Sequence, residues 1–178
     1  IGACVMLVAI VVALPLGVHT SLTKLREEAG SSYYYDKTGF AIYQGVEERE
    51  ATANNLITVA KRYTQTNSAL APLIEELDYA VRLTQNSYND FAEEASANQQ
   101  MGKAAQALYE ELKKTELSES DQKYPDQLIA QMESEQDKIN RSSYNEDARE
   151  FNARLDKFPV KLLLPFAGVQ PLGTYDYE

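Results

Sequence analysis

The chain has 178 residues, enough for one soluble domain and a membrane anchor but few for two independent hydrophobic cores. Its 17 Lys and Arg residues are outnumbered by 27 Asp and Glu residues, for a formal net charge of -10. This balance argues against nucleic acid as a partner and against a polybasic contact with anionic lipid, because both need concentrated positive charge.

Residues 1–18, IGACVMLVAIVVALPLGV, contain no charged side chain. As a helix this segment would span roughly 27 Å, close to the thickness of the hydrocarbon core of a bilayer. It lacks the basic start of a cleaved secretory signal and the polar face of a core helix. We therefore expect residues 1–18 to form one membrane-spanning helix in contact with lipid. The alternative is a hydrophobic helix buried between the subunits of a filament or another assembly.

The flanks of this segment leave the membrane topology open. The chain begins at Ile1 and not at Met, so we expect upstream residues that were removed by a protease or that precede it in the native protein. Lys24 and Arg26 favour a cytoplasmic body, but the positive-inside rule compares both flanks. Processing at Ile1 would favour an exported, assembling subunit, although Val5 stands where mature pilins usually carry glutamate.

The next residues, 19–45, predict a juxtamembrane helix followed by a loop rich in tyrosine and glycine. From residue 46 to residue 158, apolar residues recur at three- and four-residue steps, which predicts a helical bundle. The first buried stripe comprises Val46, Ala53, Leu56, Ala60 and Tyr63. The second comprises Leu70, Leu73, Leu77, Ala80 and Val81 and predicts a short helix, because the next position on that face is the polar Thr84.

The third stripe follows a polar connection with capping residues at positions 86–90, and comprises Phe91, Ala95, Ala105, Leu108 and Leu112. The last helix is predicted to be the longest, roughly 45 to 50 Å, with Ser118 and Asp121 as a cap, Pro125 in its first turn and Pro159 at its end. The tail, residues 159–178, contains prolines and glycines and is predicted to be irregular. The predicted fold is thus all-α, an antiparallel helical bundle with long helices preceded by an N-terminal transmembrane or hydrophobic helix.

Several short motifs carry a family resemblance. They are NLITVAKRY at residues 55–63, Tyr144-Asn145, FNARLDKFP at residues 151–159 and Gly168-Val169. Together they resemble the LemA family over nearly the whole chain. The resemblance implies a bacterial, single-pass membrane protein with a helical bundle, and it implies no particular reaction, because the family has no agreed biochemical function. An insertion at residues 30–40 departs from the family pattern and predicts an interruption of the helix there.

The sequence offers little for catalysis. His19 is the only histidine and Cys4 the only cysteine, which excludes a cysteine-based zinc site and an intrachain disulfide. Carboxylate pairs occur at residues 47–48, 75–76, 93–94 and 110–111. Because no histidines accompany them, we interpret these pairs as solvated acidic faces. We therefore expect no enzyme activity, no cofactor and no metal ion.

Twelve tyrosines in a chain without tryptophan are the remaining signal. Tyrosine suits contacts that are half apolar and half wet and is enriched at interfaces. Tyr63 and Tyr144 are expected in the bundle core. The predicted interaction residues are Tyr33, Tyr34, Tyr35, Tyr175 and Tyr177. The sequence thus favours a membrane-anchored, non-enzymatic scaffold that binds an unidentified protein or itself, with a self-assembling, filament-like subunit as the alternative.

Overall fold

The computed structural model describes residues 2–37, 39–88 and 90–177, and their side chains from Leu16 onward. Within these residues the regular elements are all α-helices, which confirms the predicted all-α class. In chain order the helices are α1 (Gly2–Ser31), α2 (Ile42–Lys61), α3 (Leu70–Asn86), α4 (Phe91–Leu112), α5 (Tyr124–Asn140), α6 (Ser143–Leu155) and α7 (Val160–Ala167).

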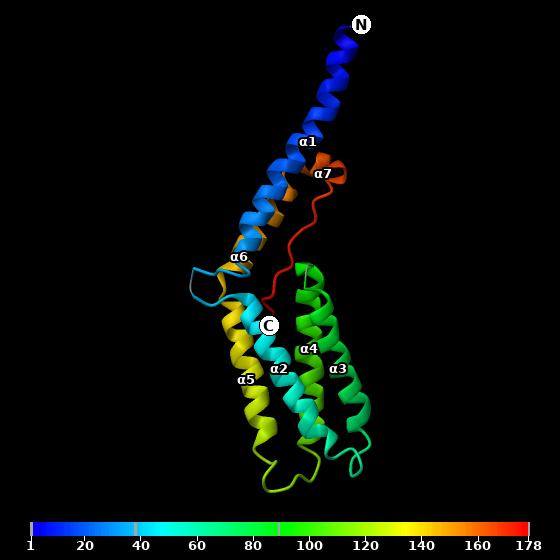
Figure 1. Ribbon diagram of the computed structural model, residues 1–178, viewed down its shortest axis with the longest axis vertical. Helices are drawn as coiled ribbons and strands as arrows, with labels where there is room; N and C mark the ends of the chain where they lie inside the picture. Colours follow the sequence, from blue (N-terminus) through cyan, green and yellow to red (C-terminus); the bar gives the residue numbers. More distant parts are fainter. Residues whose placement is uncertain (1, 38, 89, 178) are drawn as a thin grey trace.

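The helices form an elongated antiparallel bundle (Figure 1). α1 and α2 follow one another along the long axis, and α5 and α6 return beside them in the opposite direction. The α3–α4 hairpin packs on the half of the bundle that contains α2 and α5, whereas α6 and α7 pack on the second half of α1. The first half of α1 extends beyond the rest of the molecule.

The chain is interrupted between α1 and α2 and again between α5 and α6, and these two breaks lie side by side. Residues 32–41 separate α1 from α2, as the insertion in the sequence predicted. The second break, between α5 and α6, shows that the prediction of one continuous last helix was wrong. Ser142 has an extended backbone and its Oγ accepts a hydrogen bond from the Tyr144 amide, so it caps α6 and ends the rod. Asp36 in the first break accepts hydrogen bonds from Ser142 Oγ at 2.6 Å and from the Ser143 amide at 2.8 Å.

Other helix ends differ from the sequence prediction in detail. α2 begins at Ile42, ahead of the predicted residue 46. α3 is longer than predicted, because Thr84 is buried with its hydroxyl donating to the Ala80 carbonyl, so a polar residue continues the inner face. Asp121 does not cap α5; its carboxylate accepts hydrogen bonds from Arg62 and Tyr63 instead. Pro125 lies in the first turn of α5, as predicted.

The buried apolar side chains form two clusters. The distal core lies among α2, α3, α4 and α5 and includes Leu56, Leu77, Met101 and Leu108. The proximal core lies where α1, α6, α7 and the residues after α7 meet the start of α2 and α4, and its largest members are aromatic. Tyr144 is fully buried in the proximal core and Tyr63 packs on the distal core, as expected.

The tail is not wholly irregular, contrary to the prediction. Residues 160–167 form α7, because Val160, Leu164 and Ala167 pack against the proximal core. Gly168 ends the helix with a φ of +62°, a left-handed conformation that glycine adopts without steric cost. The C-terminal segment, residues 168–177, then runs back along the bundle without regular structure.

Among the residues whose side chains are described, no helix is both long enough and apolar enough to cross a membrane. Of the predicted span at residues 1–18, Ile1 and the side chains of residues 2–15 lie outside the described part of the chain.

Candidate functional site

The most elaborate polar arrangement holds the C-terminal segment against α6. The amide of Asn152 bonds both backbone groups of Leu172, donating to its carbonyl at 2.7 Å and accepting from its amide at 2.9 Å. Asn145 accepts from the Tyr175 amide at 2.8 Å. Because two helical turns take about 7.2 residues, these asparagines, seven residues apart, lie on one face of α6. The side chains of α6 therefore bind the backbone amides and carbonyls of the C-terminal segment, as a neighbouring strand binds a β-strand.

Aromatic side chains next to these asparagines line the proximal core. Tyr144 packs with its ring edge-on to Tyr33 and Tyr175, at centroid distances of 5.9 and 5.7 Å. Its hydroxyl donates to the Gly173 carbonyl at 3.0 Å. Phe151 is buried in the same core. The motifs Tyr-Asn and Phe-Asn thus combine a ring for the core with an amide for the C-terminal segment.

A buried glutamate lies at the centre of the aromatic cluster. Glu94 is 3% exposed and accepts hydrogen bonds from the Tyr33 hydroxyl at 2.7 Å and from the Tyr175 hydroxyl at 2.6 Å. Asp90 caps α4 by accepting from the amides of Ala92 and Glu93, which places Glu94 in the helix's first turns. The positive end of the helix dipole favours a carboxylate at that position. The interpretation of residues 93–94 as a solvated acidic pair was therefore wrong for Glu94.

Burial governs the protonation of this cluster. Desolvation raises the pKa of Glu94, while the hydrogen bonds from Tyr175 and Tyr33 oppose the rise. Desolvation, together with the negative charge of Glu94, raises the pKa of Tyr33 and Tyr175 far above the usual tyrosine range. The two hydroxyls consequently remain hydrogen-bond donors at any physiological pH.

A second buried polar group receives the end of the chain. Arg49 is 2% exposed and donates to the Tyr177 hydroxyl at 2.6 Å and to Gln136 Oε1. Gln136 in turn donates to the Tyr175 carbonyl at 2.7 Å. Burial lowers the pKa of Arg49, opposed by its contact with Tyr177. Arg49 Nε and Asn98 Oδ1 have no hydrogen-bond partner within the described chain, so this network is incompletely satisfied.

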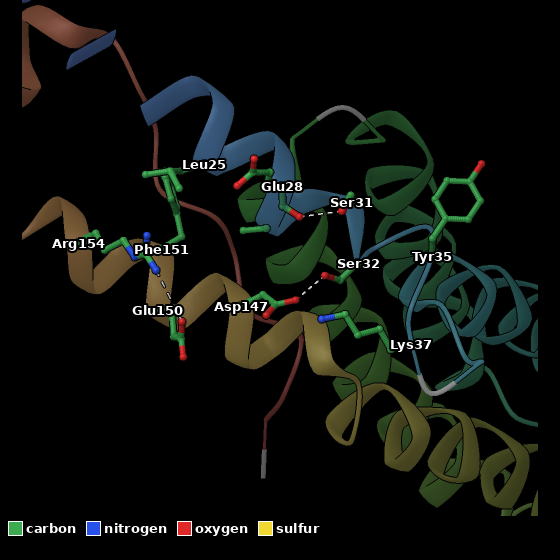
Figure 2. A pocket seen from close by; sticks show the side chains of 11 residues that line it. Leu25, Glu28, Ser31, Ser32, Tyr35, Lys37, Asp147, Glu150, Phe151 and Arg154 are labelled. Atoms are coloured by element: carbon green, nitrogen blue, oxygen red, sulfur yellow. Dashed lines mark hydrogen bonds and ion pairs between the residues drawn. The ribbon is translucent and has the colours of Figure 1, made fainter. Parts of the chain in front are cut away.

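A surface pocket of about 340 Å³ lies between the end of α1 and α6 (Figure 2). Its walls come from the end of α1, the loop after it and α6. Ser32 donates a hydrogen bond to Asp147 across the pocket. Its lining mixes apolar, acidic and basic side chains: Leu25, Glu28, Ala29, Ser31, Ser32, Tyr35, Lys37, Asp147, Glu150, Phe151 and Arg154. Such a mixed, open hollow suits a peptide or protein surface.

The predicted interaction tyrosines fall into separate environments. Tyr33 and Tyr175 are 1% and 0% exposed and belong to the proximal core. Tyr177 is half-buried against Arg49 and Asn98. Tyr34 is half-buried, and desolvation raises its pKa to about 12. Tyr35 is 84% exposed at the rim of the pocket. The structure brings Tyr33 and Tyr175 together, and partner binding by these residues stays a prediction.

Sequence reasoning missed Arg49 and Glu94, although a signal was present. Arg49 lies three residues after Val46 and four before Ala53, so it occupies the buried stripe of α2. Glu94 and Asn98 share the inner face of α4 with Met101. Charged residues at core positions of a helix indicate a buried polar site. Among the described residues, no cluster of three or more His, Cys, Asp and Glu could hold a metal ion.

Comparison with known proteins identifies the chain at the level of family. The model of the LemA family matches residues 41–178, which is more than half of the chain. No curated protein and no solved structure matches it. The matched residues include the motifs on α2 and α6 and the C-terminal segment that α6 binds. The chain therefore belongs to the LemA family, as its sequence motifs indicated.

Proposed function

We propose that this chain is a membrane-anchored, non-enzymatic scaffold, in which residues 1–18 hold the helical bundle at a membrane and the bundle binds a protein partner. One observation carries the proposal. α1 runs without interruption from Gly2 to Ser31, and its second half packs on α6 and α7. A helix that continues from an apolar segment into a folded body transmits a fixed orientation to it, whereas a flexible linker would not.

The pocket between α1 and α6 is the proposed partner site. Tyr35 stands at its rim, fully available for contact, and Phe151 contributes to its floor. Lys37 and Glu28 line the pocket, as do Glu150 and Arg154, which lie one turn apart on α6 and pair with each other. The surface therefore offers charges of both signs beside apolar side chains. Aromatic anchors with a polar rim are typical of protein interfaces.

The buried polar groups support a structural role and not a catalytic one. Glu94 and Arg49 both bind tyrosines of the C-terminal segment and lie inside the bundle. His19 has its Nδ1 2.6 Å from the Ala167 carbonyl of α7. These groups tie the chain to itself.

Flotation with lipid vesicles tests the anchor. The full chain, mixed with phosphatidylcholine vesicles in a density gradient, should float and should resist extraction at alkaline pH. Val8→Arg combined with Val11→Arg should reduce flotation by about tenfold or more, because each arginine costs about 2.5 to 3.5 kcal/mol within a membrane helix. Ala130→Arg with Gln131→Arg, at exposed positions of α5, is the matched control. A native chain that stays at the bottom of the gradient as a filament would favour the assembly alternative.

A photoreactive amino acid at Tyr35 tests the partner site in native membranes. Crosslinks to one defined protein should appear from Tyr35 and be absent when the same group replaces Tyr79, an exposed tyrosine on α3. Equal labelling from both positions would contradict the pocket as the binding surface.

A further inference from the structure

α7 is apolar except for Lys161, which is unusual for a helix at the surface of a protein. One face, with Val160, Leu164 and Ala167, packs on the proximal core. The opposite side exposes Phe166 by 75% and Leu162 by 67%, and Phe158, just before the helix, by 85%. Leu162 and Phe166 are four residues apart in the helix and form one stripe, and Phe158 lies just before the first residue of the helix. An apolar stripe of this kind normally has a partner.

The stripe lies where α1 leaves the body of the protein. α7 packs on α1 (Figure 1), and His19 of α1 contacts the Ala167 carbonyl at 2.6 Å. His19 immediately follows the uncharged segment of residues 1–18. α7 therefore lies beside the end of the proposed membrane span.

Among the described residues, the large exposed side chains without a polar atom are concentrated around α7 and the adjoining part of α1. Four of the large exposed hydrophobic side chains are tyrosines, Tyr35, Tyr79, Tyr88 and Tyr124, which carry a hydroxyl for water. The others, without any polar atom in the side chain, are Leu16, Phe158, Leu162 and Phe166, and every one of them lies in α7, just before it, or in the adjoining turn of α1.

The charges around α7 also suit a lipid surface. Lys157 and Lys161 are exposed beside the stripe, and Lys161 forms an ion pair with Asp156 at 3.2 Å. No acidic residue occurs from residue 157 to residue 175 in a chain with a net charge of -10. Lysines can extend their amines toward headgroups while their stems lie along apolar surface. An aromatic, apolar stripe with flanking lysines is typical of helices that lie in the membrane interface.

We propose that α7 lies in the interface between headgroups and acyl chains of the bilayer that residues 1–18 enter, with Phe158, Leu162 and Phe166 inserted. This inference rests on the membrane anchor proposed above. The bilayer then contacts the protein at two points, the span and α7, and this second contact holds the long axis of the bundle at a fixed angle to the membrane.

The absence of tryptophan from the sequence makes a direct test available. Phe166→Trp provides a single tryptophan, which can be excited apart from the twelve tyrosines, and Phe158→Trp, at a still more exposed position, provides an alternative should Phe166→Trp fold poorly. Tyr124→Trp, exposed at the start of α5 in the distal half, is the matched control. Each variant is reconstituted in phosphatidylcholine vesicles with and without lipid brominated near the top of the acyl chains.

Brominated lipid should reduce the tryptophan fluorescence of Phe166→Trp and Phe158→Trp to roughly half, because bromine quenches a tryptophan only by contact and the bromine atoms lie at the depth of an interfacial helix. The fluorescence of Tyr124→Trp should not change. Flotation of the same samples separates the two proposals. A chain that floats but whose tryptophan in α7 is not quenched overturns the interfacial helix and leaves the anchor intact. A chain that does not float overturns the anchor and the interfacial helix together. A blue-shifted tryptophan that resists quenching but responds to protein concentration would show that a second copy covers α7, which also overturns the proposal.

Discussion

At the scale of single residues, the burial of Glu94 costs free energy, and its carboxyl group binds the hydroxyls of two tyrosines. A carboxyl group inside an apolar cluster loses its hydration, and two tyrosine hydroxyls replace part of it. Since the pKa of Glu94 is raised in the folded protein, the native state binds a proton more tightly than the unfolded chain. Ionisation of this group therefore destabilises the fold as pH rises through the raised pKa.

Replacing Glu94 by Gln should remove this pH dependence. The free energy of unfolding of the native chain should contain a contribution that is present below the ordinary glutamate pKa of 4.5 and is lost as pH rises through the raised value. Urea unfolding between acidic and neutral pH measures it, with Glu94→Gln giving the flatter profile. Glu93→Gln, at the exposed neighbouring position, should follow the native profile. Parallel profiles for all the chains would show that Glu94 titrates normally.

Tyr175→Phe should destabilise the protein by about 1.5 to 3 kcal/mol, the usual range for a lost hydrogen bond to a charged group. The ring remains in the proximal core, so the loss comes from the bond between its hydroxyl and Glu94. Tyr35→Phe, at an exposed position, is the control and should change stability little. Chemical denaturation of the variants measures the difference, and equal stability would mean that Tyr33 alone satisfies Glu94.

At the scale of elements, the two breaks in the long rods depend on each other. Asp36 lies in the loop after α1, and Ser142 and Ser143 begin α6. The carboxylate satisfies donors at the start of a helix, where the first amides have no partner within the helix. Local sequence could predict an interruption near the glycines and tyrosines of the first break, but the second break lacks proline or glycine. Its stability comes from a residue more than a hundred positions away.

A double-mutant cycle tests this dependence. Ser142→Ala should cost about 1 kcal/mol through loss of the helix cap. Asp36→Ala should cost a similar amount, and the double variant should cost less than the sum, with a coupling of about 0.5 kcal/mol or more. Thermal or urea unfolding provides the free energies. Strict additivity would show that the two breaks are stabilised independently.

At the scale of the whole molecule, the C-terminal segment closes the proximal core. It contacts α6 through Asn145 and Asn152, α4 through Glu94, and α2 through Arg49. The distal core contains no residue from this segment. The two halves of the bundle therefore differ in what stabilises them: packing among α2, α3, α4 and α5 in the distal half, and a contact between chain ends in the proximal half.

Gly173→Ala should loosen the proximal half selectively. A methyl group at Gly173 would lie 2.3 Å from the carbonyl oxygen of Phe91, so the segment must move away from α4. We expect a loss of about 1 to 3 kcal/mol, as for overpacked cores, and faster hydrogen exchange in α6 than in α3. Gly17→Ala, where a methyl group meets no atom within 4 Å, is the matched control. Uniformly faster exchange in both halves would contradict two separately stabilised cores.

The sequence by itself determined the all-α class, most of the apolar positions on the inner faces of α2, α3 and α4, the capping residues before α4 and the membership in the LemA family. The class, the inner faces and the caps depend on neighbours within one or two helical turns, and hydrophobic periodicity and capping residues record such neighbours directly. The family membership rests on the residue identities of short motifs, which need no knowledge of tertiary contacts. Only the tertiary structure decided that α5 and α6 are separate, that α7 forms, and that Tyr33 and Tyr175 are buried on Glu94. The physical reason is distance along the chain. A polar residue is predicted to be exposed unless its hydrogen-bond partner is known, and here the partner hydroxyls, amides and carboxylates lie tens of residues away.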